Sequence, residues 1–345
     1  MYQKKSRQCC AAMLVVSVCL RLCMFLGLDE QLGQLFMQTA KSKQTAEFLL
    51  YLETGKRIAP EPIPTPTAVV YLQPVQTETQ QPPPEPVQSV KTVPAQEITI
   101  SGNCSYPFDA AALLAQQSSL CVDPSPQILV VQSHTTEAYA EEDGLTYEKI
   151  TDYRTLDETR NMLAVGDVLV QELRQRGFTV FHDRSIHDYP NYNSSYWNCL
   201  QSITWWKQKY PDVQLIIDLH RDAVENEQGQ AIALCSEQAG QQTAQLMLVV
   251  GTNEGGLEHP DWQENLANAL KLQSVLMGEY PGLCRHMDLR TERFNQHAAP
   301  GAILVEVGTN GNTLTQAKAS AALLADGIAK FLTAMEQNEG TLPPS

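Results

Sequence analysis

Short apolar segments alternate with helical patterns over the C-terminal two thirds of this 345-residue chain. The segments are rich in Val, Ile and Leu and have no polar alternation, which indicates strands buried on both faces of a mainly parallel sheet. Helices on both faces would complete a three-layer α/β fold. The predicted strands are 128–131, 178–181, 213–219, 244–250 and 302–307, and the predicted helices lie near 158–176, 193–209, 261–279 and 313–334.

Polar residues follow three of the predicted strands. The sequence is QSHTTE at 132–137, HRD at 220–222 and EVGTNGN at 306–312. In α/β sheets the chemistry collects beyond the carboxyl ends of the strands, so these segments are expected at one edge. Together they supply two histidines and three carboxylates. That set matches a mononuclear zinc site with His and carboxylate ligands and a spare Glu as base.

Each of these features also has an ordinary structural explanation. A single histidine after a strand is more often hydrogen-bonded within the protein than bound to a metal. Asp222 could orient the nearby ring of His220 or cap a helix. Glu306 is more informative, because a carboxylate at the end of an apolar strand is costly unless it is paired or used. The three strand ends together favour a metal hydrolase.

The N-terminal segment 1–28 has the features of an export signal or a membrane anchor. Three basic residues precede a mostly apolar run over 9–28, in which Arg21 is the only charge. About 20 residues can cross a bilayer, and the basic flank predicts that the N-terminus stays inside. No small-residue cleavage site follows the run. We expect a single-pass anchor in the cell membrane with the rest of the chain outside the cytoplasm, and a cleaved signal peptide is the alternative.

The segments after the anchor differ in composition. Apolar residues have helical spacing over 29–58, next to the membrane. The stretch 59–98 holds half of the 20 prolines and favours extended polyproline geometry, which makes it a semi-rigid spacer. A short connecting segment, 99–125, leads into the expected catalytic domain at 126–335. Residues 336–345 are expected to form a flexible tail.

Charge and cysteine content exclude two classes of function. The chain has 24 basic and 39 acidic side chains, a net charge of −15, whereas nucleic-acid binding needs basic surface. No C-x-x-C pair is present among the nine cysteines, which argues against a cysteine-rich zinc site. Cys104 and Cys121 flank a short segment after the spacer, and outside the cytoplasm they could form a disulfide.

Several long motifs, in order along 126–334, resemble the stage II sporulation protein P family. They are VQSHTTEAY at 131–139, HDYPNYNSSY at 187–196, IIDLHRDA at 216–223, and RTERFNQHAAPGAILVEVGTNGN within 280–317. The anchor and the proline-rich spacer also resemble the layout of that family. The resemblance implies an amidase-like fold and a peptidoglycan hydrolase related to the zinc-dependent N-acetylmuramoyl-L-alanine amidases, with amidase and peptide cross-link endopeptidase activity.

The resemblance also implies a cellular role and partners. Proteins of this family thin or remodel the peptidoglycan of the sporulation septum while the mother cell engulfs the forespore. They do so with the stage II sporulation protein D lytic transglycosylase and the membrane protein M. Peptidoglycan, these two proteins and the membrane are therefore the expected partners.

Site residues are carried over from the family's motifs one at a time. His134 is similar in position to the second histidine of the H-T-H-T-x-E segment, and His220 to the histidine of D-x-H-R-D. Glu306 matches the glutamate of the closing L-x-E-x-G strand. These matches imply a Zn²⁺ ion on the two histidines and a carboxylate, with Glu306 as the catalytic base.

The motif matches do not assign the third metal ligand, and they contain one departure from the family's pattern. We expect Glu137, within the HTTE segment, to be the third ligand, with His187 and Asp157 as alternatives. The chain has Gln132 where the family often has a histidine. If that first histidine were a ligand, this change would weaken zinc binding.

Four polar residues are candidates for substrate contact. Their guanidinium and amide groups could bind the carboxylates and amides of a stem peptide, although pairing within the domain would explain them equally well. The chief alternative function is a catalytically inactive wall-binding scaffold of the engulfment machinery, and a cytoplasmic metallohydrolase is a second alternative. The candidates are Arg221, Arg293, Asn295 and Gln296.

Overall fold

The computed structural model describes residues 89–118, 120, 127–142 and 144–339, with side chains of the last helix described as far as Met335. All of them belong to one compact unit, Thr65–Ser345. The predicted anchor, the helical segment next to it, most of the spacer and Cys121 lie outside the described residues. Within the described part, no helix is long and apolar enough to cross a membrane.

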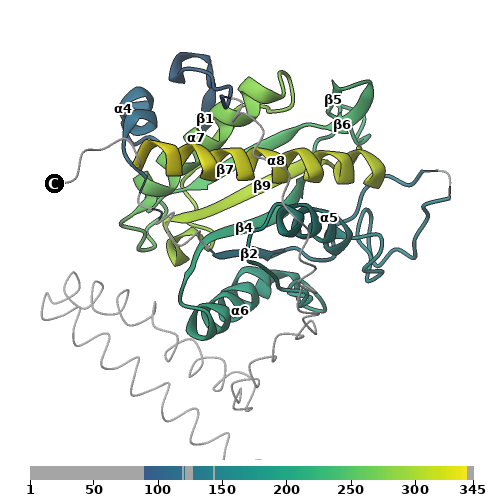
Figure 1. Ribbon diagram of the computed structural model, residues 1–345. Helices are drawn as coiled ribbons and strands as arrows, with labels where there is room; N and C mark the ends of the chain where they lie inside the picture. The colour runs from purple at the N-terminus through teal and green to yellow at the C-terminus, as the bar shows by residue number, and fades with distance from the viewer. Residues whose placement is uncertain (1–88, 119, 121–126, 143, 340–345) are drawn as a thin grey trace, which may run out of the picture. The chain divides into compact units, whose positions relative to one another are not determined.

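A seven-stranded sheet forms the centre of the fold, in the order β1-β8-β7-β9-β4-β2-β3 (Figure 1). Every neighbouring pair is parallel except β7 and β9, which are antiparallel. Because of that single reversal, β9, β4, β2 and β3 run in one direction and their carboxyl ends meet at one edge. The strands are β1 (Ile100–Gly102), β2 (Gln127–Val131), β3 (Val180–His182), β4 (Val213–Asp222), β7 (Leu246–Gly251), β8 (Met287–Arg290) and β9 (Gly301–Thr309), and a separate hairpin pairs β5 (Cys235–Gln238) with β6 (Gln241–Ala244).

Helices cover both faces of the sheet, which confirms the predicted three-layer α/β class. One layer contains α5, α7 and α8, which share a large apolar cluster with alternate residues of the strands. The other face carries α6, which packs below β2 and β4 (Figure 1) through Cys199, Ile203 and Trp206. Their bounds are α5 (Met162–Gln175), α6 (Ser195–Lys209), α7 (Trp262–Glu279) and α8 (Leu314–Glu339), with a shorter α4 (Ala110–Ala115) against α7 and 3-10 turns η1 (Ala95–Glu97), η2 (Tyr192–Ser194) and η3 (Gln296–Ala298).

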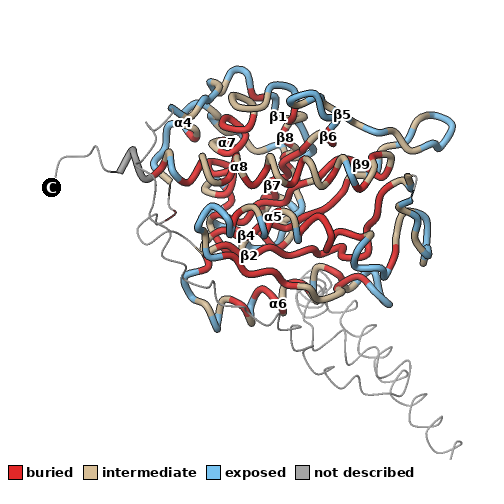
Figure 2. The backbone as a smooth tube through the Cα atoms, turned by 45° about the vertical axis from the view of Figure 1, so that its right-hand side comes forward, coloured by how far each residue is buried: buried red, intermediate tan, exposed pale blue. Residues whose placement is uncertain are grey.

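The pleat of β4 decides which of its residues face α6. Leu215, Ile217 and Leu219 belong to the apolar cluster shared with α5, α7 and α8, whereas Ile216 belongs to the cluster on the α6 side. Side chains alternate along a strand, so Asp218 and His220 also lie on the α6 side. Figure 2 shows that the central strands are buried, whereas no residue of β5 in the hairpin is buried.

The structure also contains elements that the sequence did not predict. β1 and β8 pair with each other at one side of the sheet, and β1 lies in the stretch expected to be a connector. Their sequences, ISG and MDLR, are too short and too polar to stand out as apolar runs. The sheet therefore begins before residue 126, and Leu113 of α4 joins the apolar core.

Candidate metal centre

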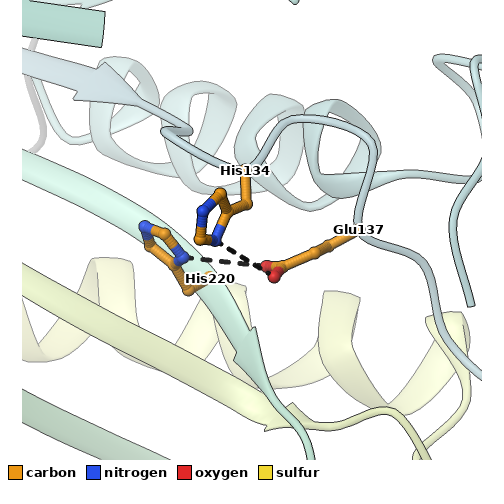
Figure 3. A group of neighbouring side chains, drawn as sticks. All are labelled: His134, Glu137 and His220. Atoms are coloured by element: carbon orange, nitrogen blue, oxygen red, sulfur yellow. Dashed lines mark ion pairs between the residues drawn. The ribbon is translucent and has the colours of Figure 1, made fainter. Parts of the chain in front are cut away.

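Three buried side chains converge beyond the carboxyl ends of β2 and β4 (Figure 3). The Nδ1 atom of His134 lies 3.3 Å from Oε1 of Glu137, and the Nδ1 atom of His220 lies 3.7 Å from Oε2 of the same carboxylate. One nitrogen or oxygen from each residue lies within 4.8 Å of the others. The structure thus brings together the three residues expected to hold a metal.

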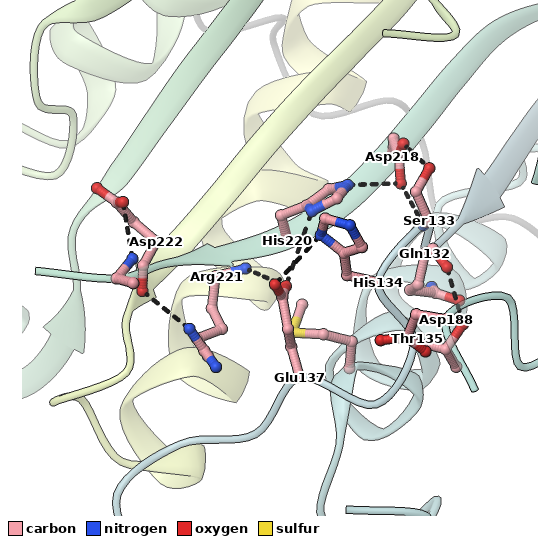
Figure 4. A network of polar contacts seen from close by, with 12 residues as sticks. Gln132, Ser133, His134, Thr135, Glu137, Asp188, Asp218, His220, Arg221 and Asp222 are labelled. Atoms are coloured by element: carbon pink, nitrogen blue, oxygen red, sulfur yellow. Dashed lines mark hydrogen bonds and ion pairs between the residues drawn. The ribbon is translucent and has the colours of Figure 1, made fainter. Parts of the chain in front are cut away.

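A network of hydrogen bonds holds the loop that carries His134 and Glu137 (Figure 4). Thr135 donates its hydroxyl to the carbonyl oxygen of Gln132 at 2.8 Å. Thr136 donates its hydroxyl to the carboxylate of Asp188 at 2.7 Å, and Arg154 binds the same carboxylate at 2.6 Å. Since Arg154 also contacts Oε1 of Glu137 at 3.2 Å, the loop is fixed from two sides.

Charged neighbours shift the pKa of two members of this group. Burial alone would raise the pKa of the Glu137 carboxyl, but the hydrogen bond with His134 and the charge of Arg221 lower that pKa to about 2. Burial disfavours a charged His220, yet Asp218 raises the pKa of this imidazole to about 10. The His220 ring without a metal therefore carries a proton at neutral pH. Metal binding would require this ring to lose that proton.

The chemistry of the donors fits zinc, which binds imidazole nitrogens and carboxylate oxygens. Two ligand atoms about 2.0–2.1 Å from a tetrahedral zinc ion are about 3.4 Å apart. The separations of 3.3 and 3.7 Å join the two histidines to different oxygens of Glu137, and one donor atom from each residue lies within 4.8 Å of the others. Three protein ligands with one free position are typical of catalytic zinc, whereas structural sites are closed by four.

Glu306 lies beside the three-residue group on the neighbouring strand. It is paired in register with His220 of β4, and the alternation along β9 places it on the same face of the sheet. Its Oε2 atom is buried and has no hydrogen-bond partner among the described residues. Burial raises the pKa of the Glu306 carboxyl to about 8, with His220 opposing this and Glu137 adding to it.

Two tyrosines form an aromatic wall at the site. The ring of Tyr192 stacks on His134, with centroids 4.7 Å apart, and remains about half exposed. The ring of Tyr196, on α6, meets His134 edge-on at 5.2 Å and stacks on His220 at 6.1 Å. The position of Tyr196 at the site could not be predicted from the sequence, because an aromatic residue near the start of a helix most often packs within the fold.

The four candidate substrate residues have partners inside the domain. Arg221 donates from Nε to the carbonyl of Ala138 at 2.9 Å and from its backbone N–H to Glu137 at 3.2 Å. Arg293 donates to the carbonyl of Glu258 at 2.9 Å. The other two bind backbone groups: Asn295 binds the carbonyl of Tyr196, and Gln296 binds the N–H of Gly251 and the carbonyl of Val249.

The alternative ligands lie apart from the three-residue group. His187 is buried and its Nε2 is 3.1 Å from Oδ2 of Asp183, in a pair of its own. Asp157 is exposed and accepts hydrogen bonds from the N–H and hydroxyl of Thr159. Neither is part of the cluster that Glu137 forms with the two histidines.

Gln132 faces away from the two histidines of the cluster. Its Nε2 atom lies 3.0 Å from Nε2 of His182 on β3, and both groups contact Gly166 of α5. Gln132 is therefore on the α5 side of the sheet, whereas His134 meets Tyr196 of α6. The Gln132 amide therefore lies on the opposite side of the sheet from His134.

Fold and site define a three-layer α/β protein with a buried His-Glu-His group at the carboxyl ends of parallel strands. A profile of the family "Stage II sporulation protein P (SpoIIP)" matches residues 73–329. The chain therefore belongs to this family, as its motifs predicted. No curated protein sequence matches it significantly.

Several solved amidase structures are similar to the chain over their whole length. One is N-acetylmuramoyl-L-alanine amidase AmiC2 of Nostoc punctiforme, with 10% identity, TM-score 0.38, and coverage of 61% of this chain and 97% of that one. Another is the CwlD amidase from Clostridioides difficile in complex with the GerS lipoprotein, with 15% identity, TM-score 0.38, and coverage of 61% and 100%. A third is an N-acetylmuramoyl-L-alanine amidase from Clostridium difficile 630, with 14% identity, TM-score 0.37, and coverage of 62% and 98%.

Proposed function

We propose that the chain is a zinc-dependent peptidoglycan hydrolase that acts as an N-acetylmuramoyl-L-alanine amidase and a peptide cross-link endopeptidase. The observation that carries this proposal is the buried His134, Glu137 and His220 group with Glu306 on the adjacent strand. Membership of the stage II sporulation protein P family supports a role in sporulation. No Ser or Cys nucleophile motif is present in the sequence, which agrees with direct attack by water.

His134, Glu137 and His220 would hold the zinc ion. When bound, zinc lowers the pKa of a water molecule toward about 7 and polarises the scissile carbonyl. Arg154 keeps the Glu137 carboxylate in place through its contact with Oε1. The ring of Tyr192, stacked on His134, limits the movement of that imidazole and covers one side of it.

Glu306 would move the proton. Its partnerless Oε2 atom is the free acceptor in this region of the described structure, and it takes the proton from the attacking water. The same carboxyl then gives the proton to the departing amine. Burial raises the pKa of the Glu306 carboxyl to about 8, and a cation held by the neighbouring residues would lower it again, so that Glu306 could act as a base.

Replacing the proposed base tests this function. Purified full-length protein and Glu306→Gln are incubated with purified sacculi, and the products are identified by mass spectrometry. The variant should lose about 10²–10⁴-fold in cleavage rate, the usual contribution of a general base, while its zinc content stays unchanged. Glu227→Gln, in an exposed loop, is the matched control and should cleave like wild type.

The products assign the bond, and their absence decides against the proposal. Free stem peptides show amidase cleavage, and separated cross-links show endopeptidase cleavage. Undiminished activity of Glu306→Gln would place the base elsewhere. If the wild type releases no product even from sacculi pretreated with a lytic transglycosylase, a wall-binding scaffold becomes the better explanation.

The cellular setting is part of the same proposal. Segment 1–28 would anchor the chain in the cell membrane with the catalytic domain at the sporulation septum. Family membership supports partnership with stage II sporulation proteins D and M. Fractionation of sporulating cells should find the protein with the membrane, and recovery in the cytoplasmic fraction would contradict this placement.

A further inference from the structure

Asp218 is a buried residue of β4, the strand that carries His220. It lies on β4 two residues before His220, so both side chains are on the α6 face of the sheet. Its side chain is only 10% exposed. Burying a carboxylate is costly unless its oxygens are paired, so the partners of Asp218 indicate what the residue is for.

The first partner of Asp218 is the ring of His220. Oδ1 lies 3.1 Å from Nε2 of the imidazole (Figure 4), in an ion pair that lacks the alignment of a hydrogen bond. The opposite ring nitrogen, Nδ1, is the atom directed toward Glu137. A carboxylate on one nitrogen fixes the ring orientation and leaves the other nitrogen for a metal.

The second partner of Asp218 is Ser133, the residue before His134. The backbone N–H of Ser133 donates to Oδ1 at 2.8 Å, and its hydroxyl donates to Oδ2 at 2.5 Å. These two bonds tie the end of β2 to β4 at the point where the chain turns toward His134. One carboxylate thus contacts the segments of both histidines.

The other aspartate next to His220 has different partners. Asp222 binds the guanidinium of Arg285 at 2.7 Å, and Figure 4 shows its carboxylate away from both histidines. The sequence had suggested Asp222 as the residue that could orient His220. The geometry instead assigns this role to the residue on the N-terminal side of the histidine.

We propose that Asp218 is the positioning residue of the metal centre: it orients His220 directly and His134 through Ser133, so that their nitrogens converge with Glu137 on one ion. This inference rests on the proposed function, because it requires that the three residues bind zinc. It makes Asp218 responsible for the affinity and geometry of the site, without contact to substrate or to the ion.

Metal binding by full-length variants tests the proposal. Zinc affinity is measured by competition with a chromophoric chelator, and the visible spectrum of the Co²⁺-loaded protein reports ligand geometry. Asp218→Asn should bind zinc about 10–100-fold more weakly and show an altered Co²⁺ spectrum. Asp222→Asn makes the same change on the same strand and should match wild type in both measurements.

A second variant covers the case in which Asp218→Asn does not fold, which circular dichroism of the metal-free protein would show. Ser133→Ala removes the hydroxyl bond to Oδ2 and leaves the rest of Asp218 in place, so zinc affinity should fall by a smaller factor in a folded protein. Wild-type affinity and an unchanged Co²⁺ spectrum in a folded Asp218→Asn, or in Ser133→Ala if Asp218→Asn is unfolded, would overturn the inference but leave the zinc hydrolase intact. Failure of the wild type to bind zinc would overturn both.

Discussion

Gln132 and His134 are two residues apart in the sequence but lie on opposite sides of the sheet. Gln132 contacts His182 on the α5 side, while His134 lies with His220 on the α6 side. The position where the family often has a histidine is therefore a packing position in this chain. The Gln132 amide lies 3.0 Å from the His182 ring, and His134, Glu137 and His220 come together without it.

Adding a methyl group at Gly166 tests this packing. A Cβ atom there would lie 2.5 Å from Nε2 of Gln132 and 2.7 Å from Nε2 of His182. Ala is favoured over Gly inside a helix by about 1 kcal/mol, but overpacking a buried site costs about 1–3 kcal/mol and here also displaces a hydrogen bond. We expect Gly166→Ala to lower the free energy of unfolding by about 1–2 kcal/mol in urea titrations.

A control at the surface of the same helix isolates the steric effect. Gln171 is exposed on α5, so Gln171→Ala should change the free energy of unfolding by no more than about 0.5 kcal/mol. Equal or greater stability of Gly166→Ala would show that Gln132 and His182 can move apart freely, and the packing explanation would fail.

At the scale of elements, the sequence predicted the long buried strands and helices but missed the short ones. Runs such as the one in β2 are apolar throughout, whereas β8 alternates buried and partly exposed residues over only four positions. The antiparallel junction of β7 and β9 depends on the path of the chain between strands, which local patterns do not encode.

The candidate site was also predictable from the sequence only in part. His134, His220 and Glu306 could be predicted because each lies near the carboxyl end of a strong strand, and these strands share one direction. The role of Asp218 could not, because it depends on the distance from β4 to Ser133 at the end of β2. The substrate candidates in RTERFNQH were chosen by residue type alone, and the structure gives each of the three a partner inside the domain.

The contact between the loop after β7 and η3 should make stability depend on pH. His259 is 1% exposed and its ring lies 6.4 Å from that of His297 in η3. Burial lowers the pKa of His259 to about 4, and the charges of His297 and Arg293 contribute, against the opposing effect of Asp261.

The sign follows from the lower pKa in the folded state. Between the folded pKa of about 4 and the unfolded pKa of about 6.5, the unfolded chain binds more protons than the folded protein. The contribution of His259 to stability is therefore fully present above pH 6.5 and is lost as the pH falls toward 4. His259 alone should lower the free energy of unfolding by about 2 kcal/mol between pH 7.5 and pH 5. Urea unfolding at pH 7.5 and 5 should show a smaller pH effect for His259→Gln than for wild type, and an equal pH effect would contradict this account.

For the whole molecule, the proposed function places the predicted anchor, segment 1–28, and the α/β unit at opposite ends of the proline-rich stretch. The family profile covers residues 73–329, so it includes part of the proline-rich stretch as well as the α/β unit. At about 3 Å per residue, an extended segment 59–88 could reach roughly 90 Å, whereas Val90, Val93 and Ile98 already pack against the apolar core. Such a reach would suit a hydrolase that acts on a wall at a distance from the membrane.

The most direct measurement is the zinc content of the purified full-length protein, compared with that of His220→Ala. Removing one of the two histidines leaves too few donors for a stable site. We predict about one zinc ion per wild-type chain and a large loss of zinc in the folded variant. Wild-type protein without zinc, or a variant that retains all of it, would contradict the central claim that His134, Glu137 and His220 form a metal centre.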